Sequence, residues 1–252
     1  MLEALKEITM QEWIYPLCVV GAGYTVLGLT GFGSALVIVP LLAWQWPLPE
    51  VVALTLLMDV PASMFHSGLN WRQVQWKELI RLLPGLVVGS LLGLWLTHEL
   101  HSSWPLFVLG VYVAVVGLNA LRQTATARAP VSPRWAYAVG AAVGVVEMMF
   151  GTAGPLVVAW LSRRVPDIQA MRASTPMIIT VAASTVLSGM AWDGRLSSPD
   201  LWSRWLVLVA MAMGGVWLGH RLAHRVSLAR LRQIICGLLV VSGGMLALKA
   251  WL

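Results

Sequence analysis

The sequence predicts an all-α integral membrane protein made of two repeats with inverted topology. Of its 252 residues, 58% are hydrophobic and 11% are charged, whereas a soluble domain has about 25% charged residues. Apolar segments of roughly 18 or more residues, enough to cross a bilayer, recur along the whole chain. Two of these segments are interrupted near their centre by similar glycine-containing motifs, which indicates an internal repeat.

The apolar segments define the predicted elements in order. The first, residues 13–46, is broken near 31–34, and a later one, residues 134–161, is broken near 150–154. The unbroken spans are 51–69, 79–97, 104–121, 169–191, 202–222 and 231–251. The longest polar connection is the natural boundary between a first repeat, 1–121, a cytoplasmic linker, 122–133, and a second repeat, 134–252.

The charges of the loops predict how the two repeats are related. Lys and Arg are concentrated in loops 70–81, 122–134, 162–172 and 221–232, whereas loops 46–50 and 98–103 have none. Because basic loops stay in the cytoplasm, both loops that flank 134–161 are expected on the same side. That segment must then cross twice or fold back. Each repeat would hold one broken or re-entrant element plus three transmembrane helices. Arms of roughly 15–18 residues leave open whether the broken elements cross fully or re-enter.

The two interruptions carry the strongest functional signal. Phe32-Gly33-Ser34-Ala35 is similar to Phe150-Gly151-Thr152-Ala153, about 118 residues later. Glycine and a small hydroxyl residue weaken a helix inside an apolar span. A helix that begins in mid-membrane presents unpaired N–H groups and the positive end of its dipole, so an anion is the predicted ligand. The alternative is that the glycines only allow close helix packing, which is the favoured interpretation for Gly89, Gly93, Gly215 and Gly219.

Polar residues near the interruptions complete the predicted site. Arg172 can bind an oxyanion through two hydrogen bonds, or it can be a plain cytoplasmic-side arginine. The predicted substrate-binding residues are Gly31, Phe32, Gly33, Ser34, Ala35, Thr55, Phe150, Gly151, Thr152, Ala153, Gly154, Arg172, Ser174 and Thr175. Asp59, Glu147 and His66 are candidates for proton coupling, because ionisable side chains inside the membrane are often functional. The alternatives are carboxylates that only line the pore and an interfacial histidine.

Several functions are disfavoured by what the sequence lacks. Cys18 and Cys236 lie in separate apolar spans and have no metal-ligand spacing, so neither a metal nor a disulfide is predicted. The sequence shows no nucleophile–base pair and no buried cluster of His and carboxylate, so we expect no enzyme and no cofactor. The net charge of +6 belongs to short loops and does not predict nucleic-acid binding. The expected partners are the lipid bilayer and a small anion, for a monomer or homodimer.

These residues resemble a known family. The motif Gly31-x-Gly33-small-x-Leu36-x-x-Val39-Pro40, its second copy, the start Arg172-Ala-Ser-Thr and the pair Ser67-Gly68/Ser188-Gly189 are similar to the TauE/SafE sulfite exporter (TSUP) family. The similarity extends over essentially the whole chain. It implies a multi-pass inner-membrane carrier, as in bacteria or archaea, for sulfite, sulfoacetate or a related organosulfonate or sulfur oxyanion. The duplicated motif and the inverted loop charges predict that the carrier works by alternating access, as an exporter. A passive anion channel with the same pore is the alternative.

Overall fold

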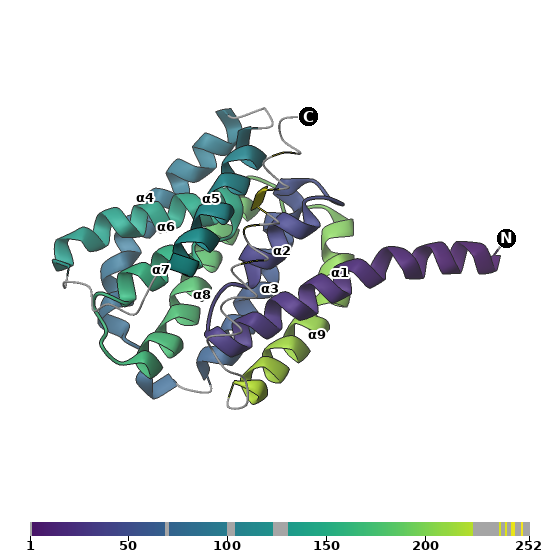
Figure 1. Ribbon diagram of the computed structural model, residues 1–252. Helices are drawn as coiled ribbons and strands as arrows, with labels where there is room; N and C mark the ends of the chain where they lie inside the picture. Colours follow the sequence, from purple (N-terminus) through teal and green to yellow (C-terminus); the bar gives the residue numbers. More distant parts are fainter. Residues whose placement is uncertain are drawn as a thin grey trace.

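The computed structural model describes residues 2–68, 71–99, 104–122 and 131–223, with a few single positions beyond them. The predicted span 231–251 and most of the linker 122–133 therefore lie outside the described residues. Within the described ranges every regular element is a helix (Figure 1). Five of these helices are long and apolar enough to cross a membrane. The prediction of an all-α membrane protein is confirmed.

The helices follow the predicted spans within a few residues, except that α1 begins at Leu2, well before the predicted start at residue 13. Their bounds are α1 Leu2–Thr30, α2 Ser34–Leu42, α3 Leu48–Gly68, α4 Trp76–Glu99, α5 Trp104–Arg122, α6 Ala136–Phe150, α7 Gly154–Leu161, α8 Ile168–Trp192 and α9 Pro199–Leu222. Two short 3₁₀ helices, η1 Trp71–Gln73 and η2 Pro133–Trp135, precede α4 and α6.

Both predicted interruptions are present, and each begins with a glycine in the left-handed conformation. Gly31 (φ 85°) and Gly151 (φ 63°) end α1 and α6. Their N–H groups still donate to the carbonyls four residues earlier, Leu27 O at 2.7 Å and Glu147 O at 2.8 Å. Glycine adopts this conformation without steric cost, which is why it commonly terminates helices.

The helix ends define the spacing between the two interruptions. Thr30 and Phe150 end their helices, and Ser34 and Gly154 begin the next ones. Both pairs are 120 residues apart, as are the starts of α3 and α8. The similar Phe-Gly dipeptides are 118 residues apart in the sequence, whereas the helix ends are 120 residues apart. Gly31 and Gly151 each directly follow a helix end, and Gly33 directly precedes α2.

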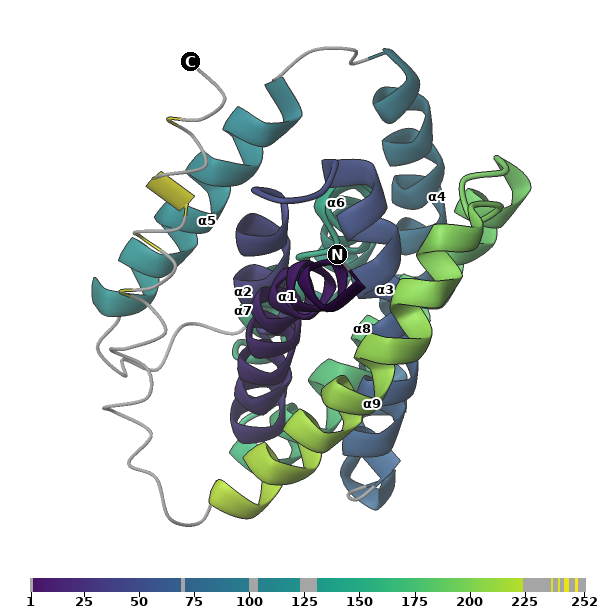
Figure 2. The ribbon, with the colours of Figure 1, turned by 90° about the vertical axis from the view of Figure 1, so that its right-hand side faces the viewer.

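The two arms of each broken element differ in length. α2 has 9 residues and α7 has 8, so each is only about 12–14 Å long. The hydrocarbon core of a bilayer is about 30 Å thick, which neither helix can cross alone. These lengths favour re-entrant short arms. Figure 2 shows α2 and α7 in the middle of the molecule, between α5 and the pair formed by α3 and α8.

Close backbone contacts hold the long helices together. α4 packs on α6, and α1 packs on α9. A Cβ atom at Gly89 of α4 would collide with the carbonyl oxygen of Ala141 on α6, and one at Gly215 of α9 would lie 2.8 Å from Gly21 O on α1. Small residues permit this approach in membranes. The packing interpretation is confirmed for Gly89, Gly93, Gly215 and Gly219.

Candidate functional site

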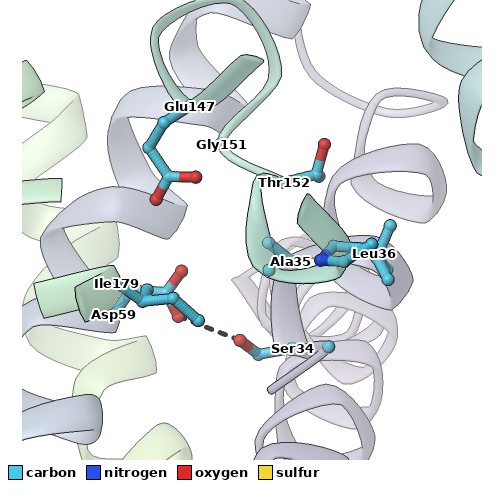
Figure 3. A pocket seen from close by; sticks show the side chains of 11 residues that line it. Ser34, Ala35, Leu36, Asp59, Glu147, Gly151, Thr152 and Ile179 are labelled. Atoms are coloured by element: carbon cyan, nitrogen blue, oxygen red, sulfur yellow. Dashed lines mark hydrogen bonds between the residues drawn. The ribbon is translucent and has the colours of Figure 1, made fainter. Parts of the chain in front are cut away.

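A small cavity lined by both polar and apolar groups lies where the short helices begin. Its volume is about 10 Å³, close to the space that one water molecule needs. It is lined by Gly33, Ser34, Ala35, Leu36, Asp59, Glu147, Gly151, Thr152, Gly154, Pro155 and Ile179 (Figure 3). The two interruptions, far apart in the sequence, therefore meet at one point.

On one side of the cavity, Asp59 joins three helices. It is buried on α3, and its Oδ1 accepts hydrogen bonds from the hydroxyl of Tyr24 on α1 at 2.8 Å and from Ser34 at 3.0 Å. Figure 3 marks the bond to Ser34, the first residue of α2. This carboxyl group thus fixes the position at which α2 begins.

On the other side, Glu147 approaches from the last turn of α6. Its Oε2 accepts the N–H of Ala153 at 2.9 Å, which bridges the interruption. Its Oε1 is buried without a hydrogen-bond partner among the described residues, and the same is true of Thr152 Oγ1. The carbonyl of Thr152 accepts a hydrogen bond from Tyr112 of α5 at 3.0 Å. Two polar atoms therefore remain unpaired on this side.

Neither short helix has a capping side chain at its start. Gly33 precedes α2 with a left-handed φ of 95°, and Ala153 precedes α7. Neither cap residue has a side chain that hydrogen-bonds into its helix, although the N–H of Ala153 itself donates to Glu147 Oε2. The first turn of a helix has N–H groups without intrahelical partners, and its dipole favours negative charge. Pro155 lacks an N–H group, so α2 offers more donors to the cavity than α7 does.

The structure brings about half of the predicted site residues to this cavity. Those that line it are Gly33, Ser34, Ala35, Asp59, Glu147, Gly151, Thr152 and Gly154. Those that do not are Gly31, Phe32, Thr55, His66, Phe150, Ala153, Arg172, Ser174 and Thr175. Among these, Gly31 and Ala153 shape the interruptions through their backbone.

Three predicted hydroxyl groups bond within their own helices instead. Thr55, Ser174 and Thr175 each donate to the carbonyl four residues earlier, at 2.7, 2.6 and 2.8 Å. Ser174 also accepts the N–H of Gln75 at 2.8 Å, so it anchors the segment before α4. Such back-bonding satisfies a hydroxyl group inside the membrane without a ligand.

Arg172 and the proton-coupling candidate His66 both lie at the end of α1. Arg172 Nη2 donates to Leu29 O at 2.8 Å, and His66 Nε2 lies 3.3 Å from Gly28 O. His66 is buried and its ring packs edge-on against His220 at 5.9 Å. Both side chains therefore contact the carbonyl groups of the last turn of α1, where the positive charge of Arg172 interacts favourably with the helix dipole.

Tyr24 and Tyr112 contribute to the site but were not predicted. Each donates its hydroxyl to a group at the cavity wall, Asp59 Oδ1 and Thr152 O. Tyr24 could have been predicted from the sequence. The buried carboxyl group of Asp59 requires hydrogen-bond donors, and the apolar spans contain few polar side chains that could supply one. Leu36, Pro155 and Ile179 also line the cavity. They carry no polar side chain that would single them out.

Membrane helices that break in mid-span, with their ends around a buried polar cavity, define a class of membrane transport proteins. The chain belongs to the TauE/SafE sulfite exporter family, whose model matches residues 15–246. It is a multi-pass membrane protein of that family.

Two relatives illustrate the similarity. The probable inner membrane transporter protein TsaS of Comamonas testosteroni is 43% identical over 199 residues, which are 79% of this chain and 83% of the relative. The probable sulfite/organosulfonate exporter TauE of Cupriavidus necator is 25% identical over 256 residues, 95% of this chain and 98% of the relative. No solved structure matches the chain.

Proposed function

We propose that this protein is a secondary transporter that exports a small sulfur-containing anion across the inner membrane by alternating access. The substrate class is sulfite, sulfoacetate or a related organosulfonate. Family membership and the names of the two relatives support this class and a role other than catalysis. The observation that carries the proposal is the meeting of two helix starts, neither with a capping side chain, at one cavity that Asp59, Glu147 and Thr152 also line.

The donors around the cavity suit an oxyanion. The first N–H groups of α2 and the hydroxyl group of Thr152 can donate to sulfonate or sulfite oxygens. Gly33 and Gly151 carry no side chain that would block this approach. A cavity of about 10 Å³ is too small for such an anion, so the walls must separate when the anion binds. A site between mobile elements meets that requirement.

The helix contacts support two inverted repeats. If α1, α2, α3 and α4 correspond to α6, α7, α8 and α9, the contact of α4 with α6 becomes that of α9 with α1. The contact of α3 with α8 maps onto itself. This exchange is what a two-fold relation between residues 1–121 and 134–252 would produce, with residues 122–133 as the cytoplasmic linker.

Two ion-pair clusters support alternating access. In one, Arg204 of α9 pairs with Glu50 of α3, and its guanidinium lies 4.5 Å from the ring centroid of Trp46. In the other, Glu78 of α4 accepts from Arg164 Nη2 at 3.1 Å and from the indole of Trp160 on α7 at 3.1 Å.

Each cluster joins the end of a short arm to a helix of the other repeat. The first cluster connects the segment after α2 to α9, and the second connects α7 and the segment after it to α4. The predicted loop topology places them on opposite faces of the membrane. Opening one cluster while the other stays closed would expose the cavity to one side at a time.

Transport by reconstituted protein tests the proposal. Vesicles loaded with sulfite or sulfoacetate should show saturable efflux that is accelerated by substrate on the opposite side, which a carrier does and a channel does not. Ala35→Leu fills the cavity and should abolish efflux, whereas Gly68→Ala, where nothing lies within 4 Å of the new methyl group, should not. Efflux unaffected by Ala35→Leu, or currents far above carrier turnover, would contradict the proposal.

A further inference from the structure

The two carboxyl groups of the cavity are not equivalent. Asp59 accepts hydrogen bonds from two hydroxyl groups, those of Tyr24 and Ser34. Glu147 has one partner, the N–H of Ala153 at Oε2, and its Oε1 has none among the described residues although the residue is only 1% exposed. Thr152, also 1% exposed, has an unpaired hydroxyl in the same cavity. Asp59 thus has hydrogen-bond partners within the protein, whereas Glu147 Oε1 and Thr152 Oγ1 have none among the described residues.

The part of the chain that the structure describes holds no cation paired with Glu147. The titratable groups that face it are Asp59 from α3 and Tyr112 from α5, and α8 contributes the apolar Ile179. An ionised carboxylate buried in this way carries a large desolvation cost, and a bound proton removes that cost.

The hydrogen bonds of Glu147 indicate where such a proton resides. Oε2 already accepts an amide N–H, as the carbonyl oxygen of a neutral carboxyl group does. Oε1 is then the hydroxyl oxygen and can act as a donor, on a side chain that lines the cavity (Figure 3). The unpaired hydroxyl of Thr152, a residue that lines the same cavity, is a second potential donor.

We infer that Glu147, protonated at Oε1, is a direct ligand of the transported anion, with Thr152 as the second donor, and that each anion binds together with one proton. Asp59 is a positioning residue that fixes the start of α2. The inference rests on the proposed function and deepens it. An ionised Glu147 would repel the anion and offer it no donor, so loss of the proton and release of the anion are linked.

The linkage can be measured with sulfoacetate, because its carboxyl and sulfonate groups stay ionised above about pH 6. Sulfite is a poorer probe since it takes up a proton near neutral pH itself. Calorimetric titration of the purified protein, in buffers with different ionisation enthalpies, counts the protons bound with the anion. The wild type should take up close to one proton per anion at the alkaline end, where affinity falls about tenfold per pH unit.

Glu147→Gln should bind sulfoacetate without proton uptake and with an affinity that does not change with pH. Glutamine keeps the shape of the protonated carboxyl group, including a donor at the position of Oε1 and an acceptor for the N–H of Ala153. Asp59→Asn is the matched comparison and should retain proton uptake. Wild-type proton uptake in Glu147→Gln would overturn the inference.

Thr152 provides an independent test that does not depend on the folding of Glu147→Gln. Thr152→Val should weaken sulfoacetate binding about tenfold or more while proton uptake persists, and Thr152→Ser should restore the affinity. Unchanged affinity in Thr152→Val would overturn the assignment of the second donor. A wild type that binds neither sulfite nor sulfoacetate would refute the proposed function itself, whereas binding with proton uptake unaltered by Glu147→Gln refutes only this inference.

Discussion

The guanidinium group of Arg172 donates to the backbone carbonyl of Leu29 at 2.8 Å, so the first turn of α8 holds the last turn of α1. The contact continues through the backbone, because a Cβ atom at Gly31 would lie 2.9 Å from the carbonyl oxygen of Arg172. The first interruption is therefore fixed by α8 as well as by the conformation of its own glycine. The second interruption has more space, since a Cβ atom at Gly151 would meet Val52 at 3.6 Å.

Substitution of the two helix-ending glycines should reveal this difference. Gly31→Ala places a methyl group at a left-handed residue and against the Arg172 carbonyl, and should lower stability by about 2–3 kcal/mol. Gly151→Ala adds only the left-handed strain, about 1 kcal/mol. Thermal unfolding in detergent measures both, and equal losses would contradict the role assigned to α8.

The interruptions were predictable from the sequence because they break the continuous apolar character of a membrane-spanning helix. Glycine and hydroxyl residues inside an apolar segment weaken a helix whatever the tertiary structure. Their register was not predictable from residue similarity, since Phe32-Gly33 and Phe150-Gly151 look alike but only Gly31 and Gly151 end a helix. Gly31 and Gly33 are both left-handed, so which of them ends the helix depends on the helices that pack against it.

The members of the cavity were only partly predictable. Thr55 and Ser174 are polar residues in apolar spans, as Ser34 is, and the sequence alone cannot tell which hydroxyl group bonds back to its own helix. The contact of Tyr24 with Asp59 depends on the relative register of α1 and α3, which is a tertiary property. Asp59 and Glu147 were found because buried charge is rare in membranes.

Removal of the Tyr24 hydroxyl should loosen the start of α2. Tyr24→Phe leaves Asp59 with one hydroxyl donor fewer and should lower stability by about 1–2 kcal/mol and weaken anion binding. Tyr15→Phe is the matched control, because its hydroxyl bonds to Leu41 O at an exposed position. Thermal unfolding and sulfoacetate binding should change in the first variant only, and equal effects would refute the role of the buried hydroxyl.

Adjacent glycines of α9 test the packing of α1 on α9. A Cβ atom at Gly215 would lie 2.8 Å from Gly21 O, whereas one at Gly214 would have nothing within 4 Å. Gly215→Ala should therefore cost about 1–3 kcal/mol in thermal unfolding, and Gly214→Ala should be neutral or slightly stabilising. A neutral Gly215→Ala would mean that α1 and α9 separate without cost.

The two ion-pair clusters predict opposite effects on access to the cavity. Ala35→Cys, in a background without Cys18 and Cys236, places a reactive thiol in the cavity wall. Its reaction with a membrane-impermeant thiol reagent can be followed from either face in vesicles of defined orientation. Glu50→Gln breaks the pair with Arg204 and should speed the reaction from the outer face. Glu78→Gln should speed it from the cytoplasmic face.

The size of the effect follows from the exposure of the pairs. Arg164, Glu50 and Arg204 have side chains that are 19–25% exposed, so each pair contributes only about 1 kcal/mol, or roughly a fivefold change in rate. Glu78 is less exposed, at 8%, and also accepts from Arg81 and Trp160, so its substitution should have the larger effect. Acceleration from the same face in both variants would exclude gates on opposite sides, because each cluster would then control the same opening.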